Sequence, residues 1–305
     1  MNRSLLRRLW IYQSERFPLL VHGLLIAVFS FSAISYARLC RGARGFISWE
    51  IYAAGVFCTV TLFLLVRIFD EHKDAEDDAK YRSELPVPRG LISLKELRLV
   101  GYVVLAAQLV VHLLFFPKML LPFAVVLGYL CLMGVEFFIP DWLRRHQFWY
   151  VTSHMFIIPL VDIYASGLDW FLADLKAPTG LLFFFVVSYL NGIVLELGRK
   201  MRAPEKESEG VLTYTAMLGI SKAVWLWIGV LGLTLFAAIV AAGFAGLGSG
   251  TTVFLFAIFA ICALPALLFW RNHTQRNAKW IEYASALWTI SMYAALGGAP
   301  MLFRM

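Results

Sequence analysis

Nine apolar segments, each long enough to cross a lipid bilayer, divide almost the whole of this chain. A spanning helix needs roughly 20 mostly apolar residues, and in lipid its backbone must satisfy its own hydrogen bonds. Only 15% of the 305 residues are charged, whereas about 25% is usual for a soluble domain. We therefore predict an all-α integral membrane protein, with residues 1–305 forming a single domain built as a bundle of nine transmembrane helices. The segments cover about 17–37, 48–69, 97–116, 119–139, 151–170, 179–198, 214–241, 251–270 and 281–303.

The basic residues are unevenly divided between the two sides of such a bundle. With the N-terminus inside, nineteen Lys and Arg fall on the inner side and six on the outer side. This positive-inside bias predicts an N-in/C-out orientation in a bacterial inner (cytoplasmic) membrane. Because it also accounts for the net charge of +7, we expect membrane lipids and no nucleic acid as partners.

The first sixteen residues carry arginines and no small-residue cleavage site, which argues against a cleaved signal peptide. Within residues 1–16, positions 4–14 suit a short interfacial helix with its arginines among the lipid headgroups. The side chains that would face lipid are Leu5, Leu6, Trp10 and Ile11.

Residues 70–78, directly after the second apolar segment, place six carboxylates in nine positions. Clustered anions at a membrane edge repel one another and resist dehydration, so they favour a bound cation. Asp70, Asp74 and Asp78 recur every four residues and share one face of a helix, with Glu71 beside them. Hard oxygen ligands suit Mg²⁺, which keeps several waters and bridges to substrate phosphates. The alternative is a solvated charge run that caps the helix.

A second charged stretch follows the sixth apolar segment. Arg199, Lys200 and Arg202 suit phosphate oxygens, arginine through its planar fork. The alternative is that these cations only satisfy the last helix carbonyls and lie among headgroups. The carboxylates that would hold a second Mg²⁺ are Glu196, Glu205 and Glu207.

At residues 70–90 the chain resembles the UbiA superfamily of intramembrane prenyltransferases. That family carries Asn/Asp-Asp-x-x-Asp-x-x-x-Asp after its second helix, followed by Arg-Pro-x-Pro-Ser-Gly. This chain has Asp-Glu-x-x-Asp-x-x-x-Asp at 70–78 and Leu-Pro-Val-Pro-Arg-Gly at 85–90. Glu71 stands at the usual Asp and keeps an oxygen ligand. Leu85 replaces the usual Arg, and Arg82 or Arg89 could supply the phosphate contact instead.

The family's second motif is an Asp-rich stretch with embedded Lys and Arg after the sixth helix. Residues 196–209 occupy that place, with Glu in place of Asp and a different spacing. The family also has a Lys-Arg pair in the region that here holds Arg144 and Arg145, which could reach a diphosphate or simply mark the inner side.

The resemblance implies Mg²⁺-dependent transfer of an isoprenyl group from a prenyl diphosphate to a lipophilic, aromatic acceptor. Asp70, Asp74, Asp78 and Glu196 would be the catalytic acids, and the loops 70–96 and 199–213 would form the site on the cytoplasmic side. Two other functions stay open: a membrane terpene cyclase or synthase with no separate acceptor, and a non-enzymatic transporter or lipid-binding protein. A transporter is expected to hold its ionisable groups near mid-membrane, whereas these acids lie at the inner edge.

Several polar residues fall inside the apolar segments, where contact with lipid is costly. We expect them to face the bundle interior, where Asp162 or Asn191 could line an acceptor pocket and Glu136 and Lys222 could equally pair with a neighbour for structural reasons. These residues are Glu136, His154, Asp162, Asn191 and Lys222.

Overall fold

The computed structural model describes residues 4–208 and 210–303, and this part of the chain is helical with no strand. Nine helices or continuous helix combinations in it are long and apolar enough to span a membrane, which confirms the predicted fold class. The protein is an integral membrane protein. The spans are α2 (Leu19–Cys40), α3 (Trp49–Lys73), α5 (Leu94–Phe115), η1 (Pro117–Met119) with α6 (Leu120–Gly134), α8 (Gln147–Met155) with α9 (Ile157–Trp170), α10 (Leu181–Arg199), α12 (Ile220–Phe244), α13 (Ser249–Arg271), and α14 (Gln275–Tyr293) with the π-helix η4 (Ala294–Gly298) and α15 (Ala299–Phe303).

Two span boundaries differ from the predicted ones, in both cases because of positive φ angles. The fourth span ends at Gly134 instead of about 139, since three consecutive left-handed residues in η2 (Glu136–Phe138) cannot continue a right-handed helix. The seventh span begins at Ile220 instead of about 214. Gly219, with φ +78°, separates it from the short helix α11 (Tyr214–Leu218).

The acidic segment extends across a helix break. The α3 helix continues to Lys73, so Asp70 lies in its last turn, and Asp74 separates α3 from α4 (Ala75–Tyr81). The Asp74 N–H donates to the Asp70 carbonyl, and the Asp78 N–H donates to the Asp74 carbonyl, both at 2.8 Å. The predicted spacing of one turn between these aspartates is therefore kept across the break.

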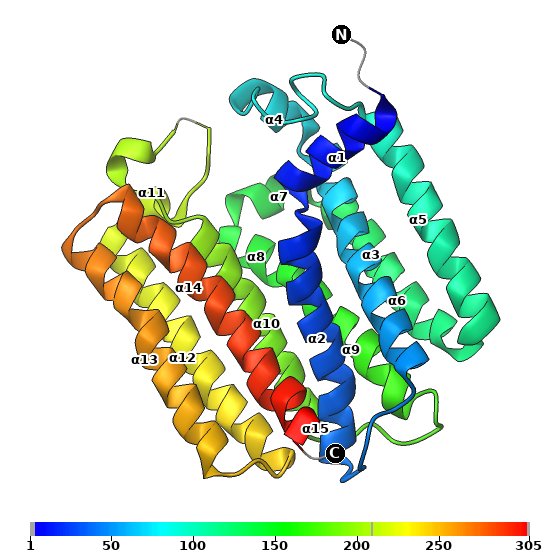
Figure 1. Ribbon diagram of the computed structural model, residues 1–305. Coiled ribbons are helices and arrows are strands. Elements are labelled where there is room, and N and C mark those ends of the chain that lie inside the picture. Colours follow the sequence, from blue (N-terminus) through cyan, green and yellow to red (C-terminus); the bar gives the residue numbers. More distant parts are fainter. Residues whose placement is uncertain (1–3, 209, 304–305) are drawn as a thin grey trace.

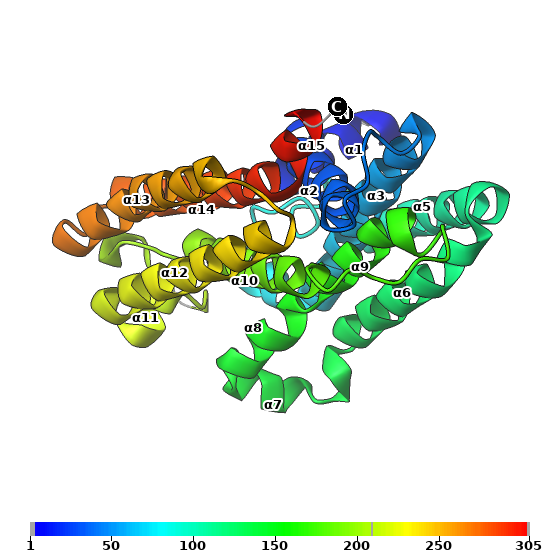
Figure 2. The same ribbon diagram turned by 90° about the horizontal axis from the view of Figure 1, so that it is seen from below.

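The first helix and the two charged segments lie at one end of the bundle. Figure 1 shows α1 (Leu5–Arg16), α4, α7 (Pro140–Arg145) and α11 at this end, while α15 lies at the other. In the middle of the molecule, α2 packs on α3, α9 and α14, and α10 packs on α9 and α14 (Figure 2). These five helices, α2, α3, α9, α10 and α14, surround the candidate site.

Glycine allows α10 to approach α14 very closely near the charged end. A Cβ atom on Gly198 would lie 2.1 Å from the Ser285 hydroxyl oxygen. The same hydroxyl accepts a hydrogen bond from the indole of Trp227 on α12. Small residues that permit such backbone approach are typical of membrane helix interfaces. The contact fixes the end of α10, which carries Glu196 and Arg199, against its neighbours.

The predicted N-terminal helix is present as α1, with Leu6 and Trp10 exposed. Its arginines are not all turned to headgroups, because Arg8 pairs with Glu96 at the start of α5 and Arg16 pairs with carboxylates of the acidic segment. One expectation for the spans was wrong: Lys222 is exposed, since it lies in the first turn of α12 at the bundle end. The other four polar residues are buried as expected. They are Glu136, which lies just beyond the end of the fourth span, and His154, Asp162 and Asn191.

Candidate active site

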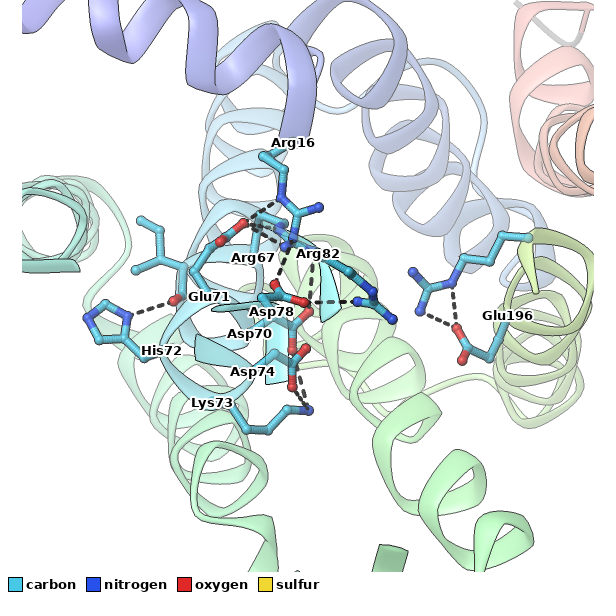
Figure 3. A network of polar contacts seen from close by, with 12 residues as sticks. Arg16, Arg67, Asp70, Glu71, His72, Lys73, Asp74, Asp78, Arg82 and Glu196 are labelled. Carbon is cyan, nitrogen blue, oxygen red and sulfur yellow. Dashed lines mark hydrogen bonds and ion pairs between the residues drawn. The ribbon is translucent and has the colours of Figure 1, made fainter. Parts of the chain in front are cut away.

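Two aspartates of the acidic segment converge on a single cation. The Nζ atom of Lys73 lies 3.7 Å from Asp70 Oδ1 and 3.8 Å from Asp74 Oδ1. It also donates a hydrogen bond of 2.9 Å to the hydroxyl of Tyr150 on α8. Figure 3 shows the two carboxylates with Lys73 beside them. The fold therefore holds the carboxylates of Asp70 and Asp74 around one position, which the ammonium group of Lys73 occupies.

Glu71 has a different environment. Its side chain is 1% exposed, and its Oε1 atom accepts hydrogen bonds from Arg16 Nε at 2.6 Å and from Arg67 Nη2 at 2.6 Å. Arg67 lies one turn earlier on α3, and Arg16 ends α1. The carboxylate thus joins two helices and orients two guanidinium groups (Figure 3).

Asp78 is almost buried and lies between two arginines. Its Oδ1 accepts a hydrogen bond of 3.1 Å from Arg82, and its Oδ2 lies 3.8 Å from Arg16. Burial raises the pKa of Asp78, an effect that the charge of Arg82 opposes. Burial likewise raises the pKa of Asp74, against the charge of Lys73. Both carboxylates therefore depend on nearby cations to remain ionised.

The second charged segment begins with an ion-pair cluster around a buried carboxylate, that of Glu196. Both oxygens of Glu196 are engaged: Oε1 by Lys200 at 2.7 Å, and Oε2 by Arg199 Nε at 2.6 Å. Arg199 also interacts electrostatically with Asp70 on α3. Asp70 and Arg199 line the same cavity, so each of the two sequence motifs contributes a charged side chain to it.

The loop after α10 folds back on itself. Arg202 donates to the carbonyls of Arg199 and Met201, so its guanidinium caps the end of the helix. The two oxygens of Glu207 accept hydrogen bonds from Thr213 and Thr215 at 2.6 and 2.7 Å. Glu205 is exposed on the short helix η3 (Pro204–Lys206). The acids predicted for a second metal do not converge here, and their assignment stays a prediction.

The other predicted phosphate ligands have local partners. Arg82 reaches Asp78, and Arg89 donates to Glu15 of α1 at 2.8 Å and to a loop carbonyl. Arg144 and Arg145 are exposed at the end of α7. None of these four is among the residues that line the central cavity.

That cavity, of about 310 Å³, lies between α1 and the five central helices. At its charged end are Arg16, Arg67, Asp70 and Arg199. Further along, its wall is formed by apolar and neutral polar side chains: Phe17, His22, Leu25, Ile26, Phe29, Phe63, Val66, Ile158, Asn191, Leu195, Thr289 and Tyr293. A mainly apolar pocket with a few convergent polar groups is the usual form of a ligand site.

The donor set fits Mg²⁺ in one specific way. Within residues 4–208 and 210–303, no group of three or more His, Cys, Asp or Glu side chains could hold a metal ion by itself. Mg²⁺ is usually bound by one or two carboxylates together with substrate phosphates. Asp70 and Asp74 meet this requirement, because they already converge on one cation beside a cavity lined by arginines.

Sequence reasoning did not assign Arg16 or Arg67 to the site. Arg67 carried a usable signal, since an ionisable residue inside a span favours a functional role and Glu71 follows it by one turn. The pairing of Arg16 with Glu71 joins positions 55 apart in the chain, and no local pattern indicates it.

The model of the UbiA prenyltransferase family matches residues 18–293. The chain belongs to this family. Among solved structures, it is similar to a structure described as digeranylgeranylglyceryl phosphate synthase in membranes, with TM-score 0.63, 14% identity, and coverage of 96% of this chain and 99% of that one.

It is also similar to an apo UbiA homolog from Aeropyrum pernix K1, with TM-score 0.65, 15% identity, and coverage of 89% of this chain and 96% of that one. At such identities the likeness shows a shared fold. Among curated proteins, no sequence matches this chain. The bundle is thus the UbiA fold, and the protein is a UbiA-family membrane prenyltransferase.

Proposed function

We propose that this protein is a Mg²⁺-dependent intramembrane prenyltransferase that moves an isoprenyl group from a prenyl diphosphate to a lipophilic, aromatic acceptor. The observation that carries the proposal is the central cavity, in which arginines and Asp70 at one end meet a long apolar wall. A prenyl diphosphate has the same two parts, a charged head and a hydrocarbon chain.

The diphosphate head belongs at the arginines. Arg16, Arg67 and Arg199 line the cavity, and they come from three different helices, α1, α3 and α10. Guanidinium groups bind phosphate oxygens through paired, charge-assisted hydrogen bonds. Such fixed cations stabilise the negative charge that develops on a departing pyrophosphate. Of these three arginines, only Arg199 was predicted from the sequence to bind phosphate. The structure adds Arg16 and Arg67 as candidates.

Asp70 and Asp74 would hold Mg²⁺, which neutralises the leaving diphosphate when bound. Asp78 would act from the buried side, where it pairs with Arg82 and Arg16 and keeps their guanidinium groups in place. Glu196 holds Arg199 and Lys200 at the opposite wall. Asp78 and Glu196 thus hold the cations in place on opposite sides of the charged end of the cavity. Glu205 and Glu207 remain the predicted ligands of a second ion.

The apolar wall would take the isoprenyl chain and exclude water from the ionised C1 atom. Phe29 and Phe63 stand edge to face, with ring centroids 5.8 Å apart, and Phe29 also packs on Tyr293. The bond from C1 to oxygen breaks first, and pyrophosphate leaves with the bonding electron pair. An acceptor in the same cavity then attacks the C1 cation, a new bond to C1 forms, and the acceptor loses a proton.

We further propose an N-in/C-out orientation in a bacterial inner membrane, which would place the charged end of the cavity at the cytoplasmic face. Single cysteines at position 76 and in the 246–250 turn, each in a cysteine-free background, test this with a membrane-impermeant thiol reagent on intact cells. Labelling of position 76 alone would show the opposite orientation.

The main test is incubation of the purified protein with labelled farnesyl or geranylgeranyl diphosphate, with and without Mg²⁺. We expect Mg²⁺-dependent pyrophosphate release that is lost in Asp74→Ala and kept in Asp77→Ala, a matched change at an exposed neighbour. Added aromatic acceptors separate transfer from cyclisation by whether the product contains the ring. No release with either chain length, in the presence of a range of acceptors, would exclude the proposed reaction.

A further inference from the structure

Asn191 places an unpaired amide in the wall of the central cavity. It lies on α10, its residue is 1% exposed, and it lines the cavity. Within the described part of the chain, neither its Oδ1 nor its Nδ2 has a hydrogen-bond partner. Buried polar groups are nearly always paired, because an unpaired one keeps the full cost of its lost hydration. An unpaired amide in a cavity wall indicates that a bound ligand supplies its missing hydrogen bonds.

Other polar side chains gather around this amide. The hydroxyl of Tyr293 on α14 approaches both Asn191 and Ser188. Asp162, on α9, is fully buried close to Ser188 and Tyr293. We name Asp162, Ser188, Asn191 and Tyr293 the polar patch. Three helices contribute to it. The side-chain oxygens of Asp162 and Ser188 lie near each other, but neither forms a hydrogen bond of good geometry within the described part of the chain.

The polar patch does not suit either part of a prenyl diphosphate. An isoprenyl chain has no donor or acceptor and would leave the amide unsatisfied. A diphosphate needs cations, and the arginines that line the cavity lie toward the charged end, beside Asp70 and the end of α10. The second substrate is therefore the occupant that fits the polar patch.

Resting on the proposed function, we propose that Asn191 and Tyr293 bind a hydroxyl or carbonyl group of a neutral lipophilic acceptor. An amide offers two N–H donors and a carbonyl acceptor, so it can both donate to and accept from one hydroxyl. Within the described part of the chain, no Lys or Arg pairs with Asp162 or Tyr293, so a carboxylate-bearing acceptor would find no counter-ion there. The patch selects for a neutral hydrogen-bonding group.

Binding of matched aromatic probes tests this on the full-length protein in detergent. The probes are 1-naphthol, 1-methoxynaphthalene and 1-naphthoic acid, with the corresponding single-ring series, and ligand-dependent thermal stabilisation gives their dissociation constants. We expect the hydroxyl compound of at least one series to bind about tenfold or more tightly than its methyl ether and its acid. The preference should disappear in Asn191→Leu and shrink in Tyr293→Phe.

Gln108→Leu is the matched control. Gln108 is a buried carboxamide on α5 that donates to Thr61 and does not line the cavity, so its variant should keep the tenfold preference. If Asn191→Leu does not fold, Asn191→Ser replaces it. A wild-type protein without hydroxyl preference in either series, a preference that survives in the Asn191 variants, or tightest binding of the acid would each overturn the proposal.

A parallel measurement separates this inference from the proposed function. It is the Mg²⁺-dependent binding of farnesyl thiolodiphosphate, a slowly ionising analogue, to the wild-type protein. If the wild-type protein does not bind the analogue but prefers the hydroxyl probes, the prenyl-diphosphate function is refuted and the polar patch remains a binding site. If the wild-type protein binds the analogue but does not prefer the hydroxyl probes, only the proposed acceptor site is refuted.

Discussion

Arg16 and Glu71 are joined by a hydrogen bond of 2.6 Å from Nε to Oε1, although they lie on different helices. The same Oε1 atom also accepts from Arg67. Glu71 stands where the UbiA motif usually has Asp, and here its longer side chain serves two arginines that line the cavity. In this structure Glu71 orients two cations, and its predicted role as a metal ligand stays a prediction.

Glu71→Gln should loosen both arginines. The amide keeps the shape but loses the negative charge, and a buried hydrogen bond to a charged group contributes about 1.5–3 kcal/mol. We expect a loss of that order in the free energy of unfolding, together with a several-fold higher KM for prenyl diphosphate. Thermal unfolding in detergent and steady-state kinetics measure the two effects. Glu76→Gln, an exposed neighbour, is the control, and equal behaviour of the two variants would contradict the positioning role.

Arg199→Ala should weaken diphosphate binding more than the loss of an arginine outside the cavity does. Arg199 lines the cavity and interacts with Asp70 from the facing helix. Loss of one guanidinium from a phosphate site costs about 1.5–3 kcal/mol, or roughly 10- to 100-fold in affinity for a diphosphate analogue. Arg276→Ala, an exposed change at the start of α14, serves as the comparison. Similar affinities in both variants would remove Arg199 from the proposed clamp.

Lys73→Gln should make the protein bind Mg²⁺ without substrate. The ammonium group now shares Asp70 and Asp74, and its removal leaves two carboxylates that repel each other. We expect Mg²⁺ alone to stabilise the variant at concentrations about fivefold or more below those needed for the wild type. A thermal-shift titration with MgCl₂, with CaCl₂ in parallel, provides the measurement. If the variant responds no better than the wild type, Asp70 and Asp74 do not form the metal site.

Gly198→Ala should destabilise the bundle where α10 meets α14. The added Cβ would lie 2.1 Å from the Ser285 hydroxyl and 3.4 Å from a backbone carbonyl, and such overpacking costs about 1–3 kcal/mol. Gly229→Ala on α12 is the control, because nothing lies within 4 Å of a Cβ there. A second change, Ser285→Ala, should recover part of the loss in thermal stability. Equal stabilities of the two alanine variants would contradict this packing.

Features that depend on short stretches of the chain were the easiest to predict from the sequence. The number of spans, the first helix and the acidic segment could all be predicted from apolar length and charge pattern. Contacts between distant segments could not, because Arg16 reaches Glu71 only once α1 lies across the end of α3. Lys222 was misplaced for a related reason: Gly219 ends the preceding helix, so the lysine lies at a helix start and not at mid-span.

Asn191 and Arg199 lie on the same helix, eight residues apart, so helical rise separates them by about 12 Å along the bundle. The contact between Gly198 and Ser285 keeps this helix from sliding against α14, which carries Tyr293. In the proposed reaction, the distance between the diphosphate and the polar group of the acceptor would therefore be fixed by backbone geometry. Acceptors would be chosen by length: the atom that attacks C1 must lie at a set distance from the hydroxyl that Asn191 binds.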